Sequence, residues 1–267
     1  MTIERHSAMA GLWAAVMEVV EGLDAADWDR VVPACPAWTV TDLVSHLGAL
    51  QSLLNGDPQP EAPADVDVPQ GASVFDHAMA APIAARRDWT REQRLDELRQ
   101  AIAAHLATLE ATTDWLSATP GPVGTTTKDG LFKVRAFDIW VHLQDLREAV
   151  GQRVDVEDES DGAATAHQYV LGLVPWMFVK RAGAQEGATL RVALGSPVNH
   201  DSVLNVVNRR AAWDPTADPR DCLVIGSPGA LTMLLSGRGT PEQWRDAGAL
   251  EWAGSRGEEF VERARLF

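Results

Sequence analysis

The stretch "FKVRAFDIWVHLQDLREAVG", residues 132–151, decides the fold of the first half of the chain. It holds no proline and ends on Gly151, a residue common just past a helix C-terminus, so it predicts one long helix. At about 100° per residue, Asp138, His142 and Asp145 lie between two apolar flanks and point inward. The arc predicted to face solvent holds Lys133, Gln144, Arg147 and Glu148. Buried carboxylates are unfavourable unless they are paired or bind a metal, so the interior must hold a partner for them.

Composition limits the classes of function. The chain has 267 residues, of which 46% are hydrophobic, enough for a sizeable core and more typical of two domains than of one. The formal net charge of −15 argues against a nucleic-acid partner. Cys35 and Cys222 are far apart and form no CxxC pair, which excludes a disulfide framework or a zinc finger and suits a reducing cytoplasm.

Neither the N-terminus nor any apolar run predicts export or a membrane span. The first residues lack the layout of a signal peptide. The longest uncharged run, residues 162–179, contains His167 and Pro175 and predicts a buried helix instead of a membrane span. We therefore expect a soluble cytoplasmic protein with no membrane partner.

The first half of the chain predicts a helical bundle. Helices are expected at about residues 6–23, at 40–54 with Thr39 as N-cap, at 72–87, at 91–116 and over the opening stretch. A proline-rich connection at residues 55–71 is too polar to pack and is expected on the surface. Apart from the short helix at 72–87, these are four amphipathic helices with one long connection, which is typical of a four-helix bundle, and we assign the bundle to residues 1–155.

The second half predicts a separate domain that mixes strands and helices. Strands are expected at residues 188–194, 221–226 and 250–254. Helices are expected to begin at Pro228 and Pro241, and after Ser255 as N-cap. The acidic segment 155–162 serves as the linker. The predicted fold class is therefore α+β, with an α+β domain over residues 161–267.

The second predicted helix adds another inward histidine. His46 lies within the apolar stripe formed by Leu43, Leu47, Leu50, Leu53 and Leu54. Together with Asp138 and His142 it would give two imidazoles and one carboxylate, a set that binds divalent metals and leaves a position open for chemistry. The alternative is a buried Asp138–His142 ion pair with an unrelated core histidine at position 46. Both interpretations stay open.

Four further residues are weaker candidates. His105 is inward on the 91–116 helix and is either a fourth ligand, a substrate contact or a core histidine. Asp145 either orients a metal ligand or makes a structural hydrogen bond. Arg135 either binds a substrate carboxylate in a catalytic role or neutralises a neighbouring acid. Cys35 precedes a helix start, where a thiol can be acidified, or is an inert buried cysteine.

Two segments together resemble a known family. "VPACPAWTVTDLVSHLG", residues 32–48, is followed about 90 residues later by "RAFDIWVHLQDLREAVG", residues 135–151. The pair strongly resembles the mycothiol-dependent maleylpyruvate isomerase family, part of the DinB-like (YfiT-like) group of metal-dependent enzymes that use thiols. "LLSGRG", residues 234–239, and "GALEWAG", residues 248–254, resemble the family's small sterol-carrier-like domain. The resemblance covers nearly the whole chain.

The resemblance implies a ligand set, a cofactor and a reaction. Its zinc ligands fall on His46, Asp138 and His142, although members of the family often carry glutamate where this chain has Asp138. It implies mycothiol as the thiol cofactor, whose binding residues we leave unassigned. A divalent cation deprotonates a thiol, which can then add to an activated double bond. The expected function is cis–trans isomerisation or thiol transfer on a small electrophilic or carboxylate substrate.

A different class of function stays open beside the enzyme. The protein would then be a non-catalytic binder of a small ligand, with a structural or vestigial metal site. Four protein ligands would indicate a structural site, whereas three indicate a catalytic one. Metal-free helices would show Asp138 bonded directly to a nearby arginine.

We also predict a catalytic role for Arg238, which lies between Gly237 and Gly239. Its guanidinium would bind an anionic substrate or the thiol cofactor. The alternative is that Arg238 is a solvated loop arginine.

Overall fold

The computed structural model describes residues 4–66, 74–122, 124–214, 216 and 222–266, which form two compact units. The first unit comprises Glu4–Leu131 and His142–Val154, and the second comprises Phe132–Val141 and the chain from Asp155 onward. One helix therefore contributes residues to both units. The predicted domains, residues 1–155 and 161–267, are continuous stretches of sequence, whereas the two units are defined by contacts. The predicted limits therefore stay a prediction.

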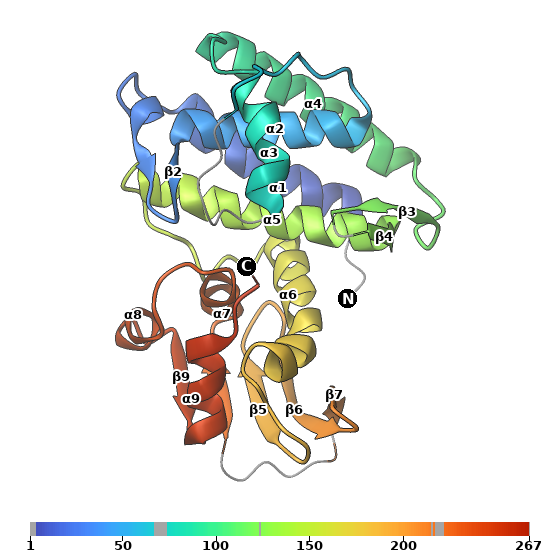
Figure 1. The fold of residues 1–267 in the computed structure, drawn as a ribbon, viewed down its shortest axis with the longest axis vertical. Coiled ribbons are helices and arrows are strands. Elements are labelled where there is room, and N and C mark those ends of the chain that lie inside the picture. The colour runs from blue at the N-terminus through green and yellow to red at the C-terminus, as the bar shows by residue number, and fades with distance from the viewer. Residues whose placement is uncertain (1–3, 67–73, 123, 215, 217–221, 267) are drawn as a thin grey trace. The chain divides into compact units, whose positions relative to one another are not determined.

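The first unit is helical, as predicted (Figure 1). Its helices are α1 (Arg5–Glu21), α2 (Val40–Asn55), α3 (Val74–Ala84), α4 (Arg91–Ala111) and α5 (Lys128–Ala149), with a short 3-10 helix η1 (Asp27–Asp29). Thr39 and Asp42 form the predicted capping box at the start of α2. Gly151 has φ +74 just past the end of α5, the left-handed conformation that glycine adopts easily. Residues 67–71 of the predicted surface connection and 72–73 of the predicted third helix lie outside the described residues.

Two predictions about burial in this unit are wrong. Gln144, expected in the wet arc of α5, is completely buried, because this part of α5 is covered on nearly all sides. Leu53 and Leu54, expected in the core, are 48% and 38% exposed, because the buried stretch of α2 ends at Ser52. The helix predicted to run to residue 116 ends at Ala111.

Two short hairpins in the first unit were not predicted. Strand β1 (Val31–Val32) pairs with β2 (Cys35–Thr39), and β3 (Ala118–Gly121) pairs with β4 (Gly124–Thr127), both antiparallel. These segments are rich in proline, glycine and threonine, a composition also typical of loops. Each hairpin ends on the threonine that caps the following helix, so the hairpins fix where α2 and α5 begin.

The second unit contains a five-stranded sheet with the order β7-β6-β5-β8-β9. Its strands are β5 (Thr189–Leu194), β6 (His200–Val207), β7 (Arg210–Asp214), β8 (Leu223–Gly226) and β9 (Leu250–Ala253), and its helices are α6 (Asp161–Lys180), α7 (Pro228–Leu235), α8 (Pro241–Asp246) and α9 (Gly254–Arg263). Among the strands of the described residues, only β5 and β8 pair in parallel. Strands β6 and β7 were not predicted. Ser255 is not the N-cap of α9, which begins after Ala253 without a side-chain cap. The predicted α+β class is confirmed.

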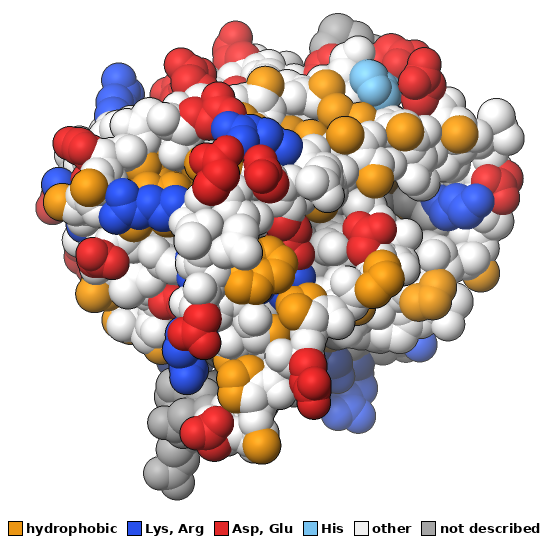
Figure 2. Space-filling view, turned by 90° about the horizontal axis from the view of Figure 1, so that it is seen from above, with side chains coloured by type: hydrophobic (Ala, Val, Ile, Leu, Met, Phe, Trp, Pro, Cys, Tyr) orange, Lys and Arg blue, Asp and Glu red, His pale blue; other side chains and the backbone are white. Residues whose placement is uncertain are grey.

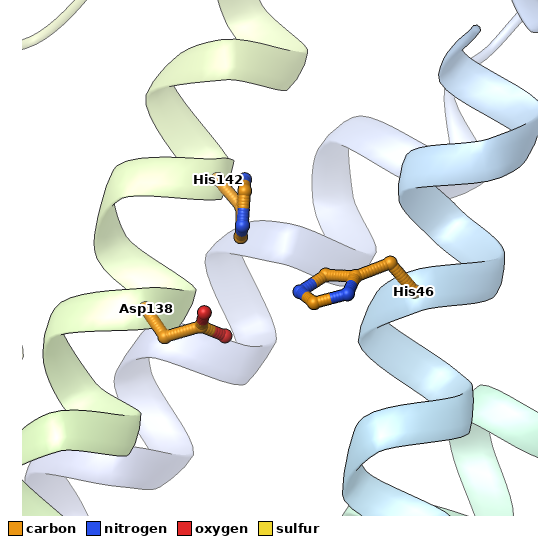
Figure 3. Close-up of side chains that lie close together, drawn as sticks. All are labelled: His46, Asp138 and His142. Atoms are coloured by element: carbon orange, nitrogen blue, oxygen red, sulfur yellow. The ribbon is translucent and has the colours of Figure 1, made fainter. Parts of the chain in front are cut away.

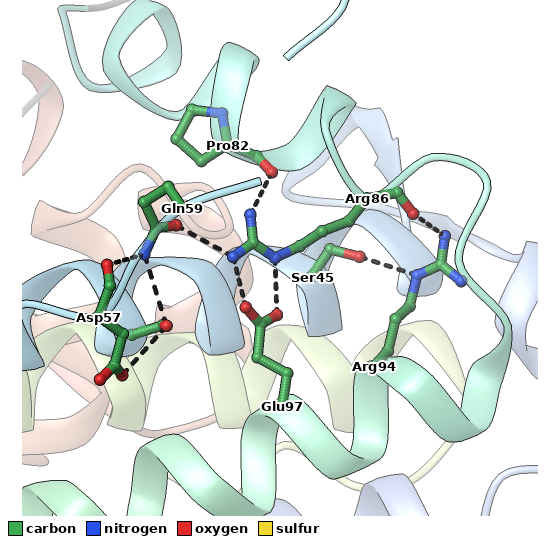
Figure 4. A network of polar contacts seen from close by, with 8 residues as sticks. Ser45, Asp57, Gln59, Pro82, Arg86, Arg94 and Glu97 are labelled. Carbon is green, nitrogen blue, oxygen red and sulfur yellow. Dashed lines mark hydrogen bonds and ion pairs between the residues drawn. The ribbon is translucent and has the colours of Figure 1, made fainter. Parts of the chain in front are cut away.

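A buried network of polar side chains joins α2, α3 and α4 (Figure 4). Arg86 is completely buried, and its guanidinium donates to both carboxylate oxygens of Glu97 on α4, to the Pro82 carbonyl and to Gln59. A buried guanidinium with this many partners is compensated for its lost hydration. Gly48 on α2 faces Glu97, and a Cβ at position 48 would approach that carboxylate to 3.2 Å. The pair therefore fits tightly against α2.

A second buried arginine, Arg94, extends the network to the part of α2 that carries His46. Arg94 donates from Nε to the Ser45 hydroxyl at 3.0 Å and from its terminal nitrogens to main-chain carbonyls before α4. Ser45 in turn donates to the carbonyl of Thr41 one turn earlier. Burial lowers the pKa of Arg94, while Asp42 raises it. The network thus anchors α2 at the residue that directly precedes His46.

Candidate metal centre

Three side chains that can bind a metal converge between α2 and α5. His46 extends from α2, and Asp138 and His142 extend from α5 toward it (Figure 3). One ligand atom from each lies within 4.8 Å of the others. Both histidines are buried and Asp138 is partly exposed. The structure thus brings together the three residues that the sequence predicted as ligands, and their role in metal binding stays a prediction.

The sequence accounts for this convergence. Asp138 and His142 are four residues apart, so they are neighbours on one side of α5. His46 lies on α2, a helix whose start is set by the Thr39 cap and whose Ser45, next to His46, accepts a hydrogen bond from Arg94. Two imidazoles and a carboxylate are a donor set that suits a divalent metal such as zinc. The residues present therefore fit the metal that the resemblance implies.

Asp145 determines which nitrogen of His142 carries the proton. Its carboxylate oxygen lies 2.8 Å from His142 Nδ1, and Asp145 is completely buried. An ionised carboxylate only accepts hydrogen bonds, so Nδ1 donates and Nε2 carries the lone pair. The same arrangement orients metal-binding histidines in many proteins. This hydrogen bond is expected under both readings of Asp145, so its role as the group that orients a metal ligand stays a prediction.

Asp138 forms an ion pair with the buried Arg135, one turn earlier on α5. Arg135 donates to Asp138 Oδ2 at 2.5 Å. Burial lowers the pKa of Arg135, and the nearby Asp138 carboxylate opposes this shift. A direct bond from arginine was the feature expected of metal-free helices. However, each carboxylate has two oxygens with two lone pairs apiece, so an ion pair with Arg135 and a bond to a metal are compatible.

Trp38 was not predicted as part of the site. Its ring centroid lies 5.1 Å from that of His46 and 6.2 Å from that of His142, and both imidazoles are tilted against it by less than 40°. The two imidazoles are 4.8 Å apart and meet edge to face. The signal in the sequence was the position of Trp38, directly before the N-cap Thr39 of the helix that carries His46.

His105, Cys35 and Arg238 are not among the three possible ligands that converge in the described part of the chain. His105 is not in the cluster of possible ligands found among the described residues, and its Nδ1 accepts a hydrogen bond from Trp13 Nε1 at 3.2 Å. It therefore matches the reading as a core histidine. Cys35 is half-buried on β2 and forms no disulfide. Arg238 is half-buried in the second unit, and its NH1 donates to the Ser236 carbonyl at 2.6 Å.

The turn that carries Arg238 has the conformation that its glycines predict. Gly237 and Gly239 have φ values of +83 and +71. The main chain of Arg238 is held on both sides, since its N–H donates to Met233 and its carbonyl accepts from Trp244 Nε1. Arg238 thus has a defined backbone position. Its predicted catalytic role stays a prediction.

The one face drawn in Figure 2 agrees with the acidic composition. On the face drawn in Figure 2, acidic side chains are widely spread and basic ones lie among them. That face shows no basic patch of the kind that binds phosphate backbones. Within the described ranges, none of the helices combines the length and the apolar character needed to span a membrane.

The comparisons with known proteins agree with the geometry. Residues 9–147 match the family described as the mycothiol maleylpyruvate isomerase N-terminal domain. The structure resembles the crystal structure of the mycothiol-dependent maleylpyruvate isomerase, with a TM-score of 0.57, 16% identity, and coverage of 96% of this chain and 94% of that one. A variant of that enzyme with alanine in place of a histidine gives the same TM-score at 17% identity. No curated protein matches the chain. Because the family match covers more than half of the sequence, the chain belongs to the mycothiol maleylpyruvate isomerase N-terminal domain family.

Proposed function

We propose that this protein is a metal-dependent enzyme that uses a thiol, mycothiol, to act on a small electrophilic or carboxylate-bearing substrate. The family supports this proposal. The single observation that carries it is the convergence of His46, Asp138 and His142, with the buried Asp145 bonded to His142 Nδ1.

Each residue around the centre has a distinct proposed task. His46, Asp138 and His142 would hold the metal, for which we propose zinc because its usual ligands are nitrogen and oxygen donors of this kind. Asp145 holds the His142 tautomer that presents the Nε2 lone pair. The buried Arg135 would hold the partly exposed Asp138 carboxylate and balance its charge, and the predicted binding of a substrate carboxylate by Arg135 stays a prediction. The two histidines are buried, so little water competes with the bound ligands.

The chemistry follows from the acidity of the thiol. A free thiol has a pKa of about 8.5 and is mostly protonated at pH 7, whereas a coordinated divalent metal lowers the pKa of a bound thiol. Three protein ligands are typical of catalytic sites, which keep a position for an exogenous group. The proposed reaction is cis–trans isomerisation of a small unsaturated acid, or addition of the thiol to a small electrophile. The proposed compartment is the cytoplasm, where the two cysteines would stay reduced.

The test is a reaction that requires both the thiol and the metal. Purified protein is mixed with maleylpyruvate in the presence and absence of mycothiol, before and after treatment with a chelator. Isomerisation gives a product of unchanged mass, whereas thiol addition gives an adduct, and mass spectrometry separates the two. We expect turnover only with thiol and metal together. Turnover that needs neither would contradict the proposal.

A second candidate is favoured by the Arg135–Asp138 ion pair. In this alternative the protein binds a small ligand without catalysis, and the metal centre is structural or vestigial. It predicts no thiol-dependent turnover with any electrophile tested, and ligand binding that is unchanged in Asp138→Ala. The enzyme proposal predicts the opposite result for both measurements, so the two are separated by the same set of proteins.

Arg238 is proposed to bind an anionic group of the substrate or of the thiol cofactor. A guanidinium can bind a carboxylate through two hydrogen bonds, and a local cation matters in a chain with a net charge of −15. Arg238→Ala is expected to lower kcat/KM at least about tenfold, roughly 1.4 kcal/mol of transition-state stabilisation, with unchanged metal content. Activity within about twofold of wild type would assign Arg238 to the loop surface.

A further inference from the structure

Trp38, His46 and His142 form a closed triangle of rings. Each pair of ring centroids lies between 4.8 and 6.2 Å apart, within the range in which aromatic rings interact. Trp38 thus contacts both imidazoles of the candidate metal centre at once. A change in the indole position would therefore affect both histidines together.

The backbone around Trp38 is held in place. The next residue, Thr39, pairs with Val31 across the β1–β2 hairpin and caps α2 through a reciprocal pair of hydrogen bonds with Asp42. Val40 then donates to the carbonyl of Arg30. The strand pairing and the helix cap fix the backbone on the C-terminal side of Trp38. The position of its indole therefore depends only on the two side-chain torsions.

The indole also covers the imidazoles. Trp38 is half-buried, whereas His46 and His142 are buried. A partly exposed ring that contacts two buried rings lies at the edge of the buried cluster. The indole therefore shields the two histidines from water on the side where it lies.

We propose that Trp38 is a positioning residue of the metal centre, which holds the imidazoles of His46 and His142 at their mutual angle and shields them from water. Its effect is to slow the loss of the metal. This inference rests on the proposed function, since it requires that the centre binds a metal. Groups that orient metal ligands from behind typically change metal affinity by about 10- to 100-fold.

Trp28 provides a matched control. It is a buried tryptophan on η1, shortly before the same hairpin, and its ring packs under the guanidinium of Arg91 instead of against an imidazole. Replacement of either tryptophan removes a large apolar side chain from the same unit. Only replacement of Trp38 should alter the metal centre.

The experiment measures the transfer of zinc from the loaded full-length protein to a coloured chelator. Zinc loss is expected to be at least about tenfold faster in Trp38→Ala and less than about threefold faster in Trp38→Phe, which keeps an aromatic ring, and to stay within about twofold of wild type in Trp28→Ala. With cobalt in place of zinc, the visible absorption bands should shift in Trp38→Ala and not in Trp28→Ala. If Trp38→Ala does not fold, Trp38→Leu replaces it with the same expectation.

The outcomes separate this inference from the proposed function. Wild-type protein that binds neither zinc nor cobalt would overturn the proposed function, and the positioning role with it. Wild-type protein that binds metal, with equal zinc loss in Trp38→Ala and Trp28→Ala, would overturn the positioning role alone. Faster loss in Trp38→Ala without rescue by phenylalanine would also contradict it, since shielding by a ring is the proposed cause.

Discussion

His142 and His105 occupy similar positions in two different parts of the helical unit. Both are inward on long helices, and they are 9% and 8% exposed. They differ in the group that contacts Nδ1, which is the Asp145 carboxylate for His142 and the Trp13 indole N–H for His105. The two histidines are thus similar in burial and in their inward position on a helix. They differ because Nδ1 of His142 faces a hydrogen-bond acceptor, whereas Nδ1 of His105 faces a hydrogen-bond donor.

The partner decides what each imidazole can do. The Asp145 carboxylate accepts a hydrogen bond from His142 Nδ1–H, which leaves the lone pair on Nε2, the nitrogen that can bind a metal. An indole N–H donates to His105 Nδ1, so that lone pair is already used and the neutral ring carries its proton on Nε2. For this pair of inward histidines, the acceptor at Nδ1 is what distinguishes His142 from His105 as a candidate ligand.

His167 on α6 is another buried histidine, and it is held neutral. Its Nδ1 lies 2.9 Å from the Thr232 hydroxyl, and its ring meets the edge of Trp140 at 4.5 Å. Burial lowers the pKa of His167 to about 4, although Asp158 opposes the shift. A histidine with a hydroxyl neighbour and apolar surroundings is thus a core residue that does not charge near neutral pH.

The largest expected effect is that of removing His142. His142→Ala should lower thiol-dependent kcat/KM by about three orders of magnitude, because it removes a ligand of the metal that supplies several kcal/mol of stabilisation. His105→Ala should lower thermal stability and leave kcat/KM within about threefold of wild type. Steady-state kinetics and thermal unfolding of both variants check this. Equal losses of activity in the two variants would break the comparison between these histidines.

The next effect is a dependence of stability on pH that comes from His167. Its pKa is about 4 in the folded protein and about 6.5 in the unfolded chain, so the unfolded state binds the proton first as the pH falls. The stability contributed by this group is complete above pH 6.5 and is lost between pH 6.5 and 4, by about 3 kcal/mol. Urea unfolding of wild type and His167→Gln at pH 7 and pH 4 measures the difference. Parallel losses in both proteins would show that His167 is not held neutral.

A smaller effect is expected from the group behind His142. Asp145→Asn keeps the size of the side chain and removes its charge, so metal affinity should fall by about 10- to 100-fold. Trp13→Phe removes the corresponding partner of His105 and should leave metal affinity within about twofold of wild type. Competition with a chelator of known affinity measures both. Unchanged affinity in Asp145→Asn would remove the proposed reason why His142 and His105 differ.

The sequence predicted the elements that carry the site because these are long and periodic. The helices with His46 on one and Asp138 and His142 on the other follow from apolar spacing and clear caps. The contact between His142 and Asp145 follows from their spacing of three residues on one helix. Trp38 was missed, because the β1–β2 hairpin that carries it has the composition of a loop.

Burial was harder to predict than secondary structure. Gln144 is on the polar arc of α5 by periodicity, yet it is buried because the helix is covered on that side as well. Leu53 and Leu54 are apolar and exposed, because the buried stretch of α2 has ended before them. Periodicity describes one helix, whereas burial depends on the elements packed around it. Strands β6 and β7 were missed although they form a local hairpin in which Val207 pairs with Arg210, and the overlooked signal was the turn at Asn208 and Arg209, both of which have positive φ.

The most direct test of the metal centre is elemental analysis of the protein purified without added metal. We predict about one divalent ion per chain, with zinc as the main element, in the wild type and in Asp138→Glu, which keeps the carboxylate. The content of His142→Ala should be close to zero. Wild-type protein without bound metal, or the same content in wild type and His142→Ala, would contradict the account.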